Sequence, residues 1–120
     1  MLSKEHVQIY QNFLEILNKV LILSTTETTP DRFISASQEA EDFFGQQIAP
    51  LAGDGVDPPM GMAWQSIHTE MHKQMKLLVT EITFYQISHQ KLAKEQRKKK
   101  ISNYTQALIR YSEMILGIED

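Results

Sequence analysis

The longest stretch of this chain without glycine or proline runs from Ala63 to Leu116, and it carries apolar residues seven positions apart. A second row follows three or four residues after each member of the first. Because an α-helix has 3.6 residues per turn, positions at these steps share one helix face. A stripe this long must be covered by other helices, so it predicts a helical bundle. The rows are Trp64, Met71, Leu78, Tyr85 and Leu92, and Ile67, His68, Met75, Ile82 and His89.

Three further segments show helical spacing of apolar residues, which gives predicted helices over about 3–23, 30–48, 60–90 and 95–117. Thr29 before Pro30 is typical of a helix start, with the threonine hydroxyl as cap. The segment between the second and third helices is rich in proline and glycine and predicts a loop. We therefore expect one domain, residues 1–120, folded as an all-α, antiparallel four-helix bundle with a longer central Pro/Gly-rich loop.

The turn between the third and fourth helices has no glycine or proline to mark it. One uninterrupted helix from Ala63 to Leu116 would be roughly 80 Å long, too long to bury its stripes within one compact domain. Extending the fourth stripe backwards from Ile101 reaches Arg97 and Lys94, which we do not expect to face a core. The predicted turn therefore lies near Lys91–Lys94.

Composition gives broad limits. The 120 residues are 42% apolar and 22% charged, as in ordinary globular domains. Cysteine is absent, which excludes disulfides and thiolate chemistry. The chain begins without a signal-peptide pattern, and its longest apolar run, Val20–Leu23, is far shorter than the roughly 20 residues that span a bilayer. We expect a cytoplasmic protein without a membrane partner.

Charge is unevenly distributed. The net charge is −3, yet six of the twelve basic residues fall within ten positions. Such a cluster, if exposed, predicts docking of an acidic partner, and a solvated helix junction is the alternative interpretation. The net charge and the lack of interleaved aromatic residues argue against nucleic acid. The basic cluster, as it is called below, consists of Lys91, Lys94, Arg97, Lys98, Lys99 and Lys100.

Other candidate sites are weaker. His68 and His72 are spaced i, i+4, but a zincin motif needs glutamate directly after the first histidine, and here it stands one place later. We expect packed histidines, no metal, no cofactor and no catalytic residues, and a metal-dependent bundle enzyme using both histidines is the competing hypothesis. Met60 and Met62 beside Trp64 are a predicted secondary contact patch.

The chain resembles the PatD family, the heterocyst frequency control proteins of filamentous cyanobacteria, in the Tyr10-Gln11 pair and in four segments. The segments are Phe43–Leu51, Trp64–Leu78, Leu108–Tyr111 and Ile115–Leu116. The resemblance extends over nearly the whole chain. It departs at Gly45, where we expect another glutamine, and at the turn between the third and fourth helices, where lysines replace Pro-Ala-Thr.

The resemblance implies a small α-helical regulator without enzymatic activity. The implied partner is FtsZ, the tubulin-like division GTPase, whose filament assembly such a regulator modulates, and through which it influences how many cells differentiate. The alternative prediction is a generic helical-bundle adaptor that binds an acidic partner segment through Lys91–Lys100. A homodimer, and the choice between bundling, stabilising and capping of filaments, are left open by the sequence.

Overall fold

The computed structural model describes residues 4–26, 29–51 and 60–117, and most of the predicted Pro/Gly-rich loop lies outside them. Of the described residues, 92% are helical and none forms a strand. The prediction of an all-α helical bundle is confirmed. The elements are α1 (Lys4–Thr25), α2 (Pro30–Phe43), the π-helical turn η1 (Phe44–Ile48), α3 (Met60–Ile87) and α4 (Lys91–Gly117).

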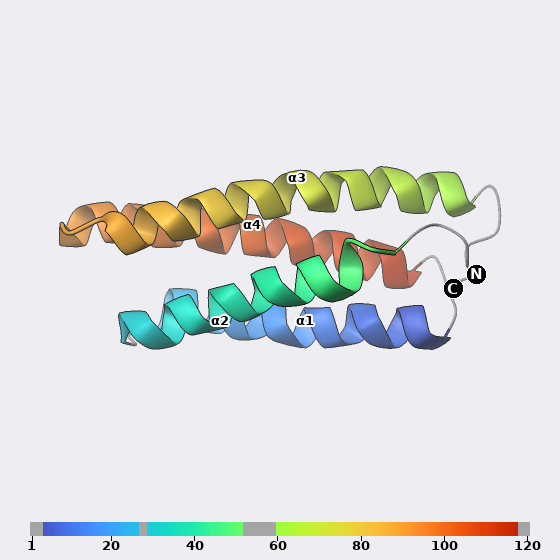
Figure 1. Cartoon of the computed structure of the whole chain (residues 1–120), viewed down its shortest axis with the longest axis horizontal. Helices are drawn as coiled ribbons and strands as arrows, with labels where there is room; N and C mark the ends of the chain where they lie inside the picture. Colours follow the sequence, from blue (N-terminus) through green and yellow to red (C-terminus); the bar gives the residue numbers. More distant parts are fainter. Residues whose placement is uncertain (1–3, 27–28, 52–59, 118–120) are drawn as a thin grey trace.

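The four helices lie side by side, and successive helices run in opposite directions (Figure 1). Helix α4 packs against both α3 and α1, whereas α2 packs mainly on α1 and touches α3 more lightly. Helices α3 and α4, with 28 and 27 residues, are longer than α1 and α2, with 22 and 14. The α3–α4 hairpin therefore reaches past the end of α1 and the start of α2 (Figure 1).

The stripe on α3 forms much of the core. Its first row is buried from Trp64 to Tyr85, as predicted. The last members of the two rows, Leu92 and His89, are exposed, and Leu92 keeps 67% of its surface accessible, because α3 ends at Ile87. The other helices contribute Tyr10, Phe13, Leu17, Val20, Phe33, Ala36, Ala40, Ile101, Leu108 and Ile115.

Helix α2 starts where the sequence predicts, but by a different interaction. Thr29 has an extended backbone, and its carbonyl accepts hydrogen bonds from the N–H groups of Arg32 and Phe33 at 3.2 and 3.4 Å. Its hydroxyl makes no capping bond, so the predicted hydroxyl cap is wrong. Pro30 supplies the helical φ angle and has no N–H that needs a cap.

The end of the second helical segment widens into η1. The N–H of Ala49 donates to the carbonyl of Phe44, five residues earlier, at 2.8 Å. Pro50 follows and has no N–H with which to continue the ladder. The N–H of Leu51 then donates to the carbonyl of Ile48 at 3.0 Å, which closes the segment. At this end of the segment, the carbonyl of Ile48 lies next to His68 of α3.

The turn between α3 and α4 lies at Ser88–Gln90, so the prediction of a turn near Lys91–Lys94 is wrong. All six members of the basic cluster belong to α4. The prediction failed because it assumed that Lys94 and Arg97 could not face another helix. Both do face α3, where their charged groups find partners. The face of α4 that packs on α3 therefore extends back from Ile101 through Arg97 to Lys94.

Leu78 and Leu77 offer a matched test of the core. Leu78 is fully buried, whereas Leu77 next to it keeps 44% of its surface exposed. We expect Leu78→Ala to lower the free energy of unfolding by about 2–5 kcal/mol, because it leaves a cavity. Leu77→Ala should change the free energy of unfolding by no more than about 0.5 kcal/mol. Urea melts of both variants test the packing, and equal effects would contradict it.

Candidate partner-binding site

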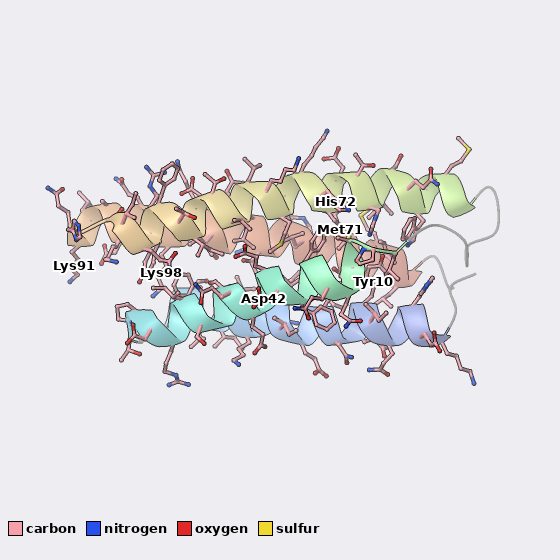
Figure 2. All side chains as sticks on the ribbon, in the orientation of Figure 1. Tyr10, Asp42, Met71, His72, Lys91 and Lys98 are labelled. Atoms are coloured by element: carbon pink, nitrogen blue, oxygen red, sulfur yellow. The ribbon has the colours of Figure 1, made fainter. Side chains whose placement is uncertain are left out.

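The basic cluster occupies the first ten residues of α4, next to the turn that joins it to α3. Lys91 lies near the tip of the α3–α4 hairpin, and Lys98 lies further back, above the end of α1 and the start of α2 (Figure 2). The six side chains divide into two groups. Lys94, Arg97 and Lys98 are half-buried and bonded to neighbouring elements, whereas the other three are exposed.

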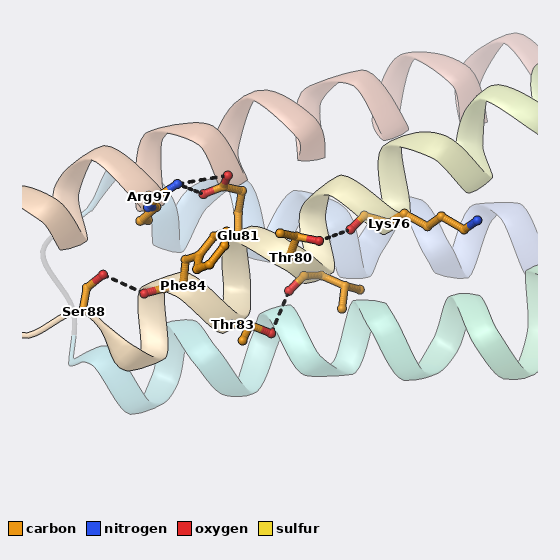
Figure 3. Close-up of polar contacts among 8 residues, drawn as sticks. Lys76, Thr80, Glu81, Thr83, Phe84, Ser88 and Arg97 are labelled. Atoms are coloured by element: carbon orange, nitrogen blue, oxygen red, sulfur yellow. Dashed lines mark hydrogen bonds and ion pairs between the residues drawn. The ribbon is translucent and has the colours of Figure 1, made fainter.

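Arg97 is held by Glu81 of α3. Its Nη1 lies 3.1 and 3.3 Å from the two carboxylate oxygens of Glu81, and its guanidinium lies 4.7 Å from the centre of the Phe84 ring (Figure 3). The Glu81 side chain is only 10% exposed. A carboxylate this deeply buried needs a cation partner, because desolvation penalises an unpaired charge. Arg97 therefore has a structural role at the α3–α4 contact.

Lys94 closes the end of α3. Its Nζ donates to the carbonyl of Tyr85 at 3.0 Å and lies 4.4 Å from the centre of the same residue's ring. Carbonyls in the last turn of a helix have no partner within the helix, and the negative end of the dipole favours a cation there. Burial also raises the pKa of the Tyr85 hydroxyl. A lysine of α4 thus stabilises the end of α3.

Lys98 connects three elements. Its Nζ lies 3.4 Å from the carbonyl of Thr26, which follows α1, and 5.2 Å from the ring centre of Phe33 in α2. Both contacts are long, so the ammonium group keeps capacity for a further partner. Among the described residues, no hydrogen bond or ion pair involves the side chains of Lys91, Lys99 and Lys100. These three, with Lys98 in part, remain available for a partner.

The predicted secondary contact patch is not continuous on the surface. Met62 is 76% exposed, whereas Trp64 is only 2% exposed and stacks on His68 with ring centres 4.3 Å apart. The side chain of Met60 lies outside the described residues. Trp64 therefore belongs to the core and contributes no exposed surface beside Met62.

His68 and His72 lie next to one another near the end of η1, with ring centres 5.0 Å apart. The Nε2 of His68 is 3.1 Å from the carbonyl of Ile48, and because a carbonyl can only accept, that nitrogen carries the proton. Within the ranges that the structure describes, no group of three or more His, Cys, Asp or Glu side chains could hold a metal ion. The His68–Ile48 bond joins η1 to α3.

A pair of aromatic side chains lies beside these histidines. The Tyr10 hydroxyl of α1 and the Trp64 ring N–H of α3 are both buried and close to one another, but neither reaches hydrogen-bonding geometry. Burial raises the pKa of Tyr10 far above its ordinary range, and the nearby Trp64 N–H opposes this in part. Tyr10, Met71 and His72 lie near one another in the central part of the bundle, away from Lys91 and Lys98 (Figure 2).

Sequence reasoning missed Glu81 and the hydroxyl residues that end α1. Glu81 is 16 residues from Arg97, and helical spacing within one helix gives no signal for a pair between helices. At the end of α1, the hydroxyl groups of Ser24, Thr25 and Thr26 all donate to carbonyls three or four residues earlier. They follow the first predicted helix, about 3–23, and helical spacing of apolar residues gives no signal for such bonds.

Comparison with known proteins provides no assignment: no family model, no curated protein and no solved structure matches this chain. In the part of the chain that the structure describes, no helix combines the length and apolar character needed to cross a membrane.

The role of Arg97 can be separated from that of its neighbour Lys100. We expect Arg97→Gln to lower the free energy of unfolding by about 1–3 kcal/mol, because it leaves the Glu81 carboxylate buried without a charged partner. Lys100→Gln, which removes an exposed charge, should change the free energy of unfolding by less than about 0.5 kcal/mol. Urea melts provide the measurement. The double variant Glu81→Gln/Arg97→Gln should recover part of the loss, and no recovery would contradict the pairing.

His68 predicts a dependence of stability on pH. Burial lowers the pKa of His68 below its ordinary value of 6.5, the neighbouring His72 lowers it further, and the bond to Ile48 opposes this in part. The unfolded chain therefore takes up a proton near pH 6.5 that the folded chain does not. The contribution of His68 to the free energy of unfolding should be fully present above this pH and should be lost as the pH drops below it.

The measurement is a series of urea melts at about pH 8, 7, 6 and 5, which covers both sides of the ordinary histidine pKa. The decline contributed by His68 can reach about 1.4 kcal/mol per pH unit at most. It should be absent in His68→Gln and retained in His89→Gln, since His89 is exposed. An unchanged pH profile in His68→Gln would contradict this assignment.

Proposed function

We propose that this chain is a non-enzymatic regulator that binds FtsZ and modulates its assembly, and that it thereby influences heterocyst frequency. The segments that resemble the PatD family suggest this partner. The observation that supports a binding role is the division of the basic cluster. Three cations are used within the fold, while Lys91, Lys99 and Lys100 project from the same helix without a partner among the described residues.

The position of these lysines suits recognition of an acidic surface. They are fixed on a helix whose other cations are bonded to α3 and to Thr26 after α1, so the backbone that carries them is already ordered. Ordering before binding reduces the entropy cost of association. Exposed cations attract an acidic partner at long range and mainly affect association rate and specificity.

The remaining parts of the cluster argue against a simple solvated junction. Lys91 and Lys94 lie in the first turn of α4, where the positive end of the helix dipole disfavours cations. Lys94 compensates by bonding the end of α3. Lys91 has no such compensation among the described residues, which favours a role outside the fold. The alternative function, a generic adaptor for an acidic partner segment, uses the same side chains and differs only in the partner.

Co-sedimentation with FtsZ filaments across a series of salt concentrations tests the proposal. We expect Lys91→Gln/Lys99→Gln/Lys100→Gln to weaken binding roughly 3- to 150-fold at low salt, because each exposed ion pair contributes about 0.2–1 kcal/mol. Binding of the parent protein should weaken as salt rises, with a screening length of about 8 Å at physiological ionic strength.

The matched control is Lys4→Gln/Lys73→Gln/Lys76→Gln, which also removes three positive charges, but from exposed positions outside the cluster. The control variant should bind like the parent, and melts should be unchanged for both triple variants. Equal loss in the two variants would assign the effect to net charge alone. Absence of the parent protein from the pellet at every salt concentration would overturn FtsZ as the partner and leave the generic adaptor.

A further inference from the structure

An open groove of about 610 Å³ lies between the basic cluster and the end of α1. The α3–α4 hairpin reaches past the shorter helices at this end of the bundle (Figure 1). One wall belongs to α4 and the other to the last residues of α1 and the residue that follows. The lining residues are Ser24, Thr25, Thr26, Lys91, Glu95, Lys98, Lys99 and Ser102.

The α4 wall is predominantly positive. Its residues recur at helical steps, so they share one face of α4. Three ammonium groups, those of Lys91, Lys98 and Lys99, stand against the single carboxylate of Glu95. From Lys91 to Ser102 the wall extends roughly 16 Å, at about 1.5 Å per helical residue. An extended peptide covers that distance with about five residues.

The α1 wall presents hydrogen-bond acceptors. The Ser24 hydroxyl donates to the Leu21 carbonyl at 2.6 Å, and the hydroxyls of Thr25 and Thr26 donate to the Ile22 carbonyl at 3.1 and 2.9 Å. A hydroxyl has one proton and two lone pairs. Since each proton is already used within α1, these hydroxyls offer the groove their lone pairs.

This combination of walls selects among anions. Phosphate and polyphosphate carry acceptors on every side, so the lysines would attract them while the hydroxyl oxygens would oppose them. An acidic peptide carries both kinds of group, because its carboxylates match the lysines and its backbone N–H groups match the hydroxyl oxygens. We infer that the groove binds an extended acidic peptide segment, with carboxylates toward Lys91, Lys98 and Lys99 and backbone N–H groups toward Ser24, Thr25 and Thr26.

The inference rests on the proposed function, because the acidic peptide segment is the part of the protein partner that this chain recognises. It also explains the position of Glu95, which stands among the three lysines. Glu95 reduces the attraction for small anions and for dense negative charge, and so it favours a ligand with spaced carboxylates. Removal of its charge should therefore strengthen binding of all anions and weaken discrimination among them.

Fluorescence anisotropy with a labelled hexapeptide of aspartate and glutamate tests the groove. Its comparison probes are the Asn/Gln counterpart, the same acidic sequence with N-methylated backbone nitrogens, and tripolyphosphate as competitor. We expect the acidic peptide to bind, at concentrations up to about 1 mM, and the uncharged counterpart and the N-methylated peptide to bind at least about threefold more weakly. Tripolyphosphate should compete poorly.

Variants assign the binding to each wall. Binding of the acidic peptide should weaken at least about threefold in Lys91→Gln/Lys99→Gln and in Thr25→Val/Thr26→Val. It should not weaken in Lys73→Gln/Lys76→Gln. The threonine double variant should affect the N-methylated peptide less, because that peptide lacks the donors. Glu95→Gln should strengthen both the acidic peptide and tripolyphosphate. Melts confirm that each variant is folded.

Three results would overturn the inference: no peptide binding at about 1 mM, binding that is unaffected by the groove variants, or tripolyphosphate binding that exceeds peptide binding with no effect of N-methylation. Failure of the proposed function is distinguishable. Peptide binding in this groove without FtsZ co-sedimentation overturns only the partner. FtsZ co-sedimentation that survives Lys91→Gln/Lys99→Gln overturns only the groove.

Discussion

The alignment of α3 with α4 depends on the contact between Glu81 and Arg97. Helices α3 and α4 extend beyond α1 and α2, so the last turns of their hairpin cannot be covered by four helices (Figure 1). A nearly buried carboxylate tolerates very few positions of its cation, because desolvation makes any unpaired arrangement costly. The pair therefore aligns α3 with α4, and Lys94 reinforces the same alignment at Tyr85.

That alignment decides which cations face outward. Once Arg97 and Lys94 point to α3, the helical repeat of α4 turns Lys91, Lys98 and Lys99 toward the end of α1, where they line the groove. Lys100 lies on another part of the helix surface. The structural and recognition roles of the cluster are thus distributed by position within the helix turn.

The helices could be predicted from the sequence because the spacing of their apolar residues depends only on the helix that carries them. Trp64, Met71, Leu78 and Tyr85 lie buried where the stripe placed them. It could not place the α3–α4 turn, because Lys94 and Arg97 look like surface residues until their partners on α3 are known. The groove was invisible for the same reason, since its two walls come from segments about 70 positions apart and meet only in the folded chain.

The packing of α4 between α3 and α1 also has a consequence for the order of folding. Helices α3 and α4 are neighbours in sequence, so their hairpin can form with little loop-closure entropy. The contact between α1 and α4 joins the two ends of the chain and requires the intervening helices to be gathered first. Such a topology favours early formation of the α3–α4 hairpin, onto which α1 and α2 dock as a second unit. The groove, which needs both units, would then be among the last features of the native state to form.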